Sequence, residues 1–130
     1  MTYFIISGHG KYASGMQGAL EAIAGEQQLI YYVDYDSDRS SDYLEDKYSN
    51  IIKKDPQSDY IFICDIIGAT PFKISAMMSI KNSKLFVVGG VNLTAILEAI
   101  FHQEMTSDEL VNLLIETTKK SVLNFNHKAR

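Results

Sequence analysis

The chain has 130 residues and carries 12 Lys and Arg against 16 Asp and Glu, a formal net charge of -4. With 46% apolar and 22% charged residues it has the composition of a folded domain, which excludes a disordered chain and favours one domain over residues 1–130. Its basic residues are scattered, which excludes a basic surface for nucleic acid.

Four short runs rich in β-branched and aromatic residues predict strands over residues 2–7, 29–35, 59–65 and 84–89. Between and after them, apolar residues spaced three or four apart predict five helices. The core-facing positions of these helices are, in chain order, Ala13, Met16, Leu20 and Ile23; Leu44, Tyr48 and Ile51; Ile74, Met77 and Met78; Leu93, Ile96 and Ile100; Leu110, Leu113 and Leu114.

Several residues mark the ends of these helices. Gly25 stands where the first helix should end, and Ser40 or Ser41 where the second should begin. The fifth helix opens at "TSDEL", with Thr106 or Ser107 as its cap.

The order strand–helix, repeated four times, predicts an α/β fold with three layers: an open, mainly parallel sheet with helices on both faces. In the flavodoxin-like order 2-1-3-4, the first and third strands are neighbours and their connections leave in opposite directions. Ligands bind at such a switch point, beyond the carboxyl ends of the strands.

A histidine and an aspartate follow these two strands. Gly8, His9 and Gly10 come after the first, and Asp65 ends the third, so the two side chains should meet at one edge of the sheet. A carboxylate that accepts a hydrogen bond from one ring nitrogen leaves the other as a nucleophile. We expect Asp65 to orient His9 and His9 to act as the nucleophile. In the alternative interpretation, His9 is an ordinary loop histidine and Asp65 only caps the loop after the third strand.

The segment "GATPF" after Asp65 predicts the start of a helix. Thr70 suits the N-cap position and Pro71 the first helical position. The N-terminus of a helix binds anions, so we expect Gly68, Ala69 and Thr70 to hold a phosphoryl group, although Thr70 could be a cap alone.

Other residues of the same sheet edge complete the expected pocket. Its rim comprises Gly8 and Gly10 after the first strand, and Gly90 and Asn92 after the fourth, where Asn92 could instead cap the fourth helix.

No metal site is expected. Asp34, Asp36 and Asp38 alternate as in a calcium loop, but Arg39 occupies the position that needs glycine, which favours a solvated turn.

The single cysteine, Cys64, lies in an apolar run and should be a buried, inert thiol. The start "MTYFIISGHG" lacks the features of a secretory signal, which favours the cytoplasm.

Three motifs together resemble a known family. "SGHGKYASG", "DIIGATPF" and "GGVNLTAILEAI" are similar, in order and spacing, to the mannose-family (mannose, fructose, sorbose) enzyme IIA domain of the bacterial sugar phosphotransferase system. The resemblance implies that His9 accepts a phosphoryl group from the phosphocarrier protein HPr and passes it to enzyme IIB, with membrane subunits involved only indirectly. It also implies that Asp65 hydrogen-bonds His9, that Thr70 supplies a hydroxyl at the start of the next helix, and that no cofactor is needed. It further implies a homodimer, often with a C-terminal segment exchanged between the subunits.

The chain departs from that family at two positions. The family commonly has "GGSP" where this chain has Gly68-Ala69-Thr70-Pro71, and often asparagine at the position of Lys73. No IIB domain follows in this chain, so the acceptor is expected to be a separate polypeptide. The alternative function is a dimeric regulatory or binding module on the same fold, without onward transfer.

Overall fold

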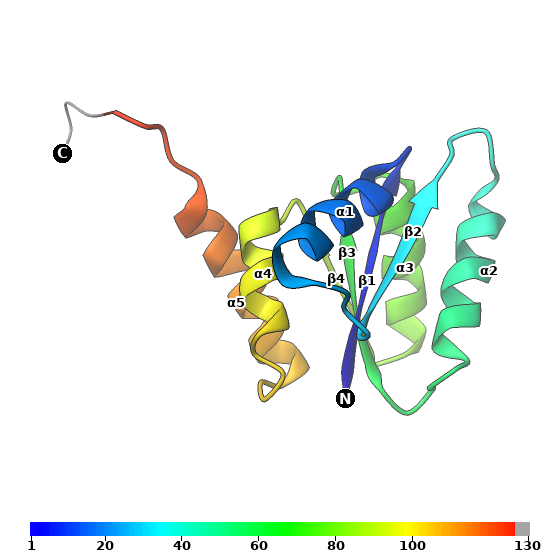
Figure 1. The fold of residues 1–130 in the computed structure, drawn as a ribbon. Coiled ribbons are helices and arrows are strands. Elements are labelled where there is room, and N and C mark those ends of the chain that lie inside the picture. Colours follow the sequence, from blue (N-terminus) through cyan, green and yellow to red (C-terminus); the bar gives the residue numbers. More distant parts are fainter. Residues whose placement is uncertain (127–130) are drawn as a thin grey trace.

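The computed structural model describes residues 1–126 and contains one parallel four-stranded sheet (Figure 1). Its strands lie in the order β2-β1-β3-β4, which confirms the predicted fold and places the first and third strands side by side. The strands are β1 (Thr2–His9), β2 (Ile30–Tyr35), β3 (Asp59–Cys64) and β4 (Leu85–Gly89).

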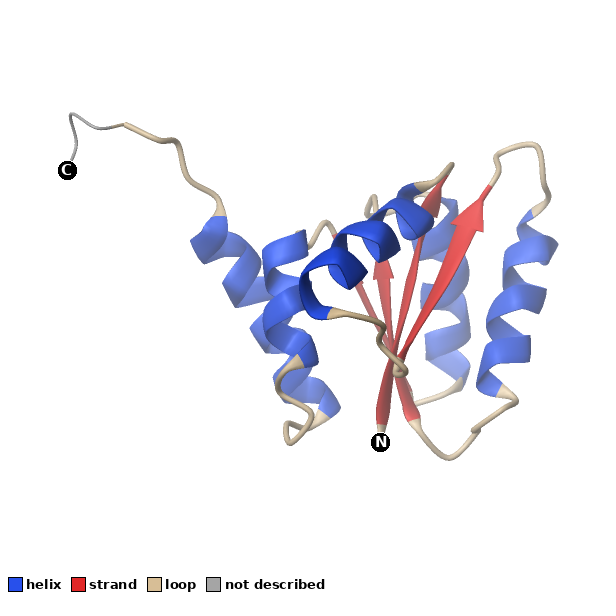
Figure 2. Cartoon of the chain, viewed as in Figure 1, coloured by secondary structure: helices blue, strands red, loops and turns tan. Residues whose placement is uncertain are grey.

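Helices cover both faces of this sheet, so the molecule has three layers (Figure 2). One face carries α1 (Tyr12–Ala24), α4 (Leu93–Ile100) and α5 (Ser107–Ser121), and the other carries α2 (Ser41–Ile52) and α3 (Thr70–Lys81). None of these helices is both long and apolar enough to cross a membrane.

The alternation of side chains along β1 divides the core in two. Phe4 and Ile6 pack toward α1, α4 and α5, whereas Ile5 packs toward α2 and α3. All three side chains are fully buried, as expected for a sheet covered on both faces.

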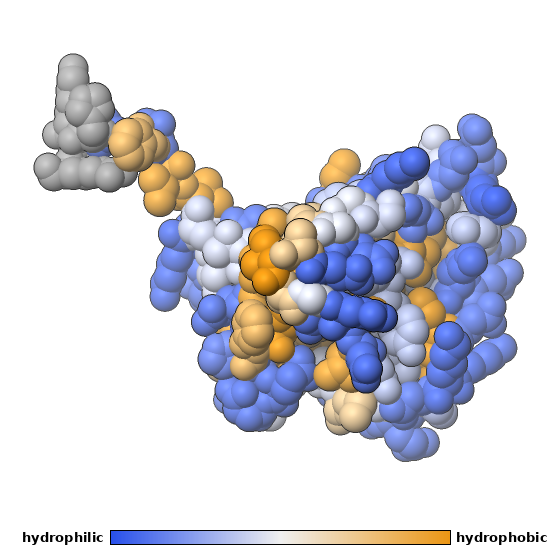
Figure 3. All heavy atoms as spheres, viewed as in Figure 1, coloured by the Kyte–Doolittle hydropathy of each residue, from blue (hydrophilic) through white to orange (hydrophobic). Residues whose placement is uncertain are grey.

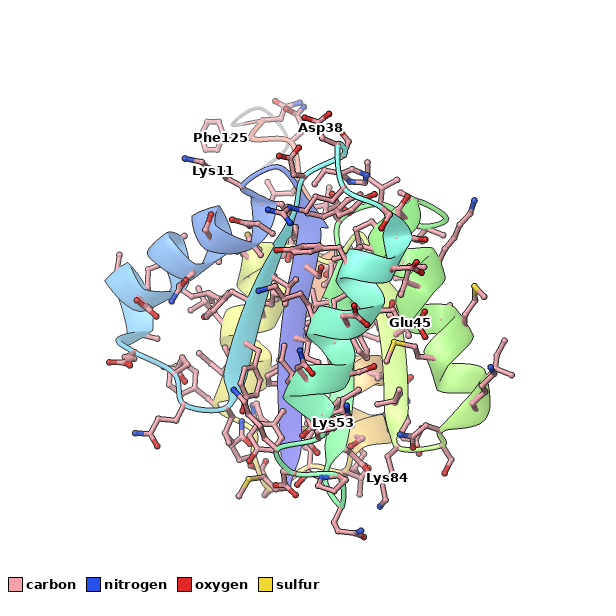
Figure 4. The ribbon with its side chains drawn as sticks, turned by 90° about the vertical axis from the view of Figure 1, so that its right-hand side faces the viewer. Lys11, Asp38, Glu45, Lys53, Lys84 and Phe125 are labelled. Atoms are coloured by element: carbon pink, nitrogen blue, oxygen red, sulfur yellow. The ribbon has the colours of Figure 1, made fainter. Side chains whose placement is uncertain are left out.

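The structure differs from the predicted elements in small but informative ways. β1 continues to His9, because its pairing with β2 extends to the end of that strand, so the histidine belongs to a strand and not to a loop. Two helix positions expected in the core are wrong: Ile23 is 64% exposed, and Met77 is also 64% exposed. Met77 lines an open cavity of about 220 Å³ between α2 and α3, into which Glu45 projects from α2 (Figure 4).

Most predicted helix ends are confirmed. Thr106 caps α5 in a reciprocal capping box with Glu109, and Gly25 follows α1 with a φ of 80°. Ser40 occupies the N-cap position of α2 but makes no capping hydrogen bond with its side chain.

Candidate functional site

His9 and Asp65 meet at the carboxyl edge of the sheet, as the sequence predicts. The ring Nδ1 of His9 lies 2.7 Å from Oδ2 of Asp65, and the backbone N–H of His9 donates to the same oxygen at 2.8 Å. The other carboxylate oxygen, Oδ1, accepts the backbone N–H of Ile66 at 2.8 Å. Both carboxylate oxygens are therefore held, and His9 is bound through its backbone as well as its ring.

The pairing of β1 with β3 brings these residues together. Ser7 is opposite Cys64 in the register, so the chain leaves both strands at the same level. Gly8 then allows a close approach: a Cβ there would lie 2.5 Å from the Tyr12 ring and 2.8 Å from the carboxyl carbon of Asp65. A larger residue at position 8 would therefore displace one of them.

Hydrogen bonding determines the charge and tautomer of the pair. Burial raises the pKa of Asp65, but the hydrogen bonds from the backbone and ring of His9 and from Ile66 outweigh it, and the pKa is lowered from its ordinary value. An ionised carboxylate only accepts hydrogen bonds, so Nδ1 of His9 carries the proton. The lone pair of the ring then lies on Nε2, which is the nitrogen able to attack.

The segment after Asp65 begins α3, with a correction to its cap. Ala69 occupies the N-cap position, its side chain makes no capping bond, and Thr70 is the first helical residue, so the prediction of Thr70 as cap is wrong. The reason is that Gly68 makes the turn with a φ of 84°, which leaves Ala69 in an ordinary extended conformation. In this first turn, Thr70 and Phe72 offer N–H groups that lack intrahelical acceptors, and Pro71 has none to offer.

The loop after β4 reaches the same edge. The backbone N–H of Gly90 donates to the carbonyl of Cys64 at 3.2 Å, so this loop lies beside the residue that precedes Asp65. Asn92 caps α4 by accepting from the N–H of Ala95, and its amide donates to Ser121 of α5. Its side chain is thus engaged with two helices, in agreement with its alternative role as a cap.

Three residues near the pair were missed by sequence reasoning. The ring of Tyr35 stands edge-on to that of His9, with centroids 5.8 Å apart, and Tyr35 is opposite His9 in the register. Tyr12 packs against Gly8, and Asp34 accepts the backbone N–H of Ser14 at the start of α1. The predicted strand order placed β2 beside β1. Asp34 and Tyr35, which lie on β2, could therefore have been found by aligning the ends of these two strands.

The site is open to solvent. The His9 side chain is 39% exposed, whereas that of Asp65 is only 10% exposed. Ile66 and Ile67, which follow Asp65, are 58% and 68% exposed. Lys11 lies at this end of the sheet, whereas Lys53 and Lys84 lie at the opposite end (Figure 4). A half-exposed imidazole on a surface that also carries exposed apolar side chains suits a macromolecular partner.

The described residues hold no group of three His, Cys, Asp or Glu side chains that could bind a metal ion. The chemical capacity of the site lies in one oriented imidazole held by Asp65, the residue that precedes the turn and first helical residues of α3.

The fold and the site define an α/β protein with a histidine–aspartate pair at its topological switch point. Residues 3–115 match the family model EIIA-man, described as the PTS system fructose IIA component. The chain therefore belongs to this family of the sugar phosphotransferase system.

Individual relatives agree with this assignment. The chain is 28% identical over 126 residues to the PTS system mannose-specific EIIAB component of Escherichia coli (strain K12), covering 94% of this chain and 39% of that protein. It therefore spans well under half the length of this relative. It is 27% identical over 123 residues to the PTS system fructose-specific EIIA component of Bacillus subtilis (strain 168), covering 93% and 84% of the two chains.

A solved structure shows the same fold. The mannose/sorbose specific IIA subunit of the phosphotransferase system from Enterococcus faecalis superposes with a TM-score of 0.89 at 23% identity, covering 96% of this chain and 95% of that one.

Proposed function

We propose that the protein is a phosphocarrier in which Nε2 of His9 accepts a phosphoryl group from phosphorylated HPr and passes it to enzyme IIB. The observation that carries this proposal is the 2.7 Å contact between Nδ1 of His9 and the ionised Asp65. Membership of the EIIA-man family supports a general role in phosphoryl transfer during sugar uptake.

In the proposed reaction, the Nε2 lone pair attacks the phosphorus of the donor phosphohistidine. The bond between phosphorus and the donor nitrogen breaks, and the donor imidazole leaves. The His9 ring gains positive charge, which the Asp65 carboxylate offsets through Nδ1. The proposed phosphoryl-binding groups follow Asp65 in the chain: the Gly68–Ala69 turn and the N–H groups of Thr70 and Phe72 at the start of α3. The proposed rim of the pocket comprises Gly8, Gly10, Gly90 and Asn92.

The test is incubation with phosphoenolpyruvate, enzyme I and HPr, followed by mass mapping of the modified residue. We expect one phosphoryl group on His9, labile in acid and stable in base. His9→Ala should abolish the label without unfolding the protein. Labelling that persists in this variant would remove His9 from the reaction.

We further propose a homodimer that forms through the C-terminal segment and acts in the cytoplasm. Among the described residues β4 pairs with β3 alone, so its outer edge can accept another strand. After α5 the chain leads away from the sheet, and Val122 and Leu123 are 70% and 73% exposed (Figure 3). Such apolar residues favour burial against a second copy.

The alternative function is a regulatory or binding module that does not pass the phosphoryl group on. The openness of the site, with His9 39% exposed, is compatible with it, since a recognised partner would need the same access. Mixing the phosphorylated protein with the IIB protein distinguishes the two functions. Discharge of His9 supports the phosphocarrier, and retention of the label supports the module.

A further inference from the structure

A small group of buried polar side chains lies in the core directly below the His9–Asp65 pair. With tyrosine and cysteine set aside, only four polar residues of the described chain are buried, and two of them, Ser7 and Ser75, belong to this group. The others are Tyr48 and Cys64, which are also fully buried. We call Ser7, Tyr48, Cys64 and Ser75 the polar layer.

The polar layer ties each of the two central strands to a helix. On β1, the hydroxyl of Tyr48 from α2 donates to Oγ of Ser7 at 2.6 Å. On β3, Sγ of Cys64 lies 3.6 Å from Oγ of Ser75 on α3. Ser7 and Cys64 are opposite each other in the register, and each stands one or two residues before a member of the site pair. The ties therefore act where the positions of His9 and Asp65 are set.

The contacts of Ser75 connect this layer to the start of α3. Its hydroxyl lies 2.9 Å from the carbonyl of Pro71 and 3.0 Å from that of Phe72, both in the first turn. The Ser75 hydroxyl donates its proton to a carbonyl of the first turn, and its oxygen accepts from the Cys64 thiol. Ser75 therefore joins the end of β3 to the turn that offers the N–H groups. No other side chain in this set contacts both segments.

We propose that Ser75 is a positioning residue, which through Cys64 holds the first turn of α3 in place beside Asp65 for phosphoryl transfer. This inference rests on the proposed function and assigns it a residue that never touches the phosphoryl group. A hydroxyl is otherwise hard to explain here, since a buried polar group costs free energy unless it is paired and an apolar residue would fill the same space.

The variant Ser75→Ala tests the role with little expected effect on folding. The carbonyl of Pro71 keeps its helical backbone donor, alanine favours the helix, and only the weakly bonding Cys64 thiol loses a partner. Ser79→Ala is the matched control, because Ser79 also bonds back to a helix carbonyl, that of Ala76 at 2.7 Å, but one turn farther from the site.

Transfer from phosphorylated HPr is measured for the wild type and both variants, together with thermal unfolding. We expect Ser75→Ala to lower kcat by about 10-fold while KM for HPr stays unchanged, since a misplaced group slows reaction more than docking. Ser79→Ala should match the wild type. Equal kcat values for the two variants, or a change in KM alone, would overturn the proposal.

Two further measurements keep the outcome decisive. Failure of HPr to phosphorylate the wild type would reject only the proposed function. Chemical labelling of His9 by phosphoramidate needs no partner protein, so it tests the positioning role of Ser75 even in that case. We expect Ser75→Ala to be labelled several-fold more slowly than Ser79→Ala, and equal rates would contradict the role. Should Ser75→Ala not fold, Cys64→Ala removes the same contact from the β3 side, and transfer at the wild-type rate in that variant would reject the proposal.

Discussion

At the scale of single residues, the site depends on one carboxylate oxygen that accepts two hydrogen bonds from His9. The backbone bond fixes where the residue lies, and the ring bond fixes the tautomer. Because Asp65 is also bound by Ile66, its carboxylate cannot rotate away without losing several bonds. The direction of Nε2 is thereby set by groups that would need no movement during the proposed reaction.

Asp65→Asn should separate these effects. The amide can keep one hydrogen bond but no longer offsets charge on the ring, so we expect the phosphorylation rate of His9 to fall by about 100-fold with the fold retained. Stopped-flow or rapid-quench labelling measures this change. An unchanged rate would show that the aspartate is a structural cap.

The same substitution should change the response to acid. A carboxylate whose pKa is lowered in the folded state contributes stability above its unfolded pKa, about 3.9 for Asp, and loses it as pH falls through the folded value. The acid-induced loss of stability should therefore be smaller in Asp65→Asn than in the wild type. Unfolding by urea at pH 7 and at successively lower pH tests this, and identical pH dependence would contradict the assignment.

Gly8→Ala should damage the site through space alone. A Cβ at this position would press on the Tyr12 ring and the Asp65 carboxyl, so we expect a loss of about 1–3 kcal/mol of stability and slower labelling of His9. Gly15→Ala is the matched control: a Cβ there meets nothing within 4 Å, and alanine within α1 should add about 0.5–1 kcal/mol. Equal behaviour of the two variants in chemical denaturation and labelling would refute the close approach.

At the scale of elements, the sequence predicted most of the architecture because each strand and helix had its own period and its own end signals. Thr106 and Gly25 are examples, since local hydrogen bonding decides both positions. Thr70 shows where this fails: either residue 69 or residue 70 could have started α3, and the turn at Gly68 decided between them. Met77 shows a second limit, because apolar residues lie on more than one side of α3 and periodicity alone could not choose the buried side.

The His9–Asp65 pair was predictable from the sequence, and its neighbours on β2 could have been, but its contacts with the helices could not. His9 and Asp65 followed from the strand order and the switch-point rule. Tyr12 and the buried Ser75 contact residues of other elements, and no pattern within one element reveals such contacts.

The end of α4 carries a pH-dependent contact. Hydrogen bonds from His102 to Glu104 and Glu98 raise the pKa of this histidine, so its contribution to stability is present below the ordinary pKa near 6.5 and is lost as pH rises through the higher folded value. We expect His102→Gln to reduce the fall in Tm between pH 6 and pH 9, measured by circular dichroism. A wild-type pH dependence in this variant would mean that other groups are responsible.

At the scale of the whole molecule, the proposed dimer and the phosphoryl site use different parts of the chain. A chain that ends at Ser121 lacks the exposed Val122 and Leu123 but keeps α5, whose core residues Leu110 and Leu114 are fully buried. We expect this truncated protein to be monomeric in sedimentation velocity and still to label His9 from phosphorylated HPr. A dimer that survives truncation would place the interface elsewhere.

The distance of 56 positions between His9 and Asp65 along the chain has a consequence for synthesis. On the ribosome His9 emerges well before Asp65. Its imidazole therefore lacks the hydrogen bond that orients it until β3 pairs with β1. The orientation that the proposed reaction needs is thus acquired together with the long-range pairing of β1 and β3, and a nascent or partly unfolded chain cannot hold the histidine in it.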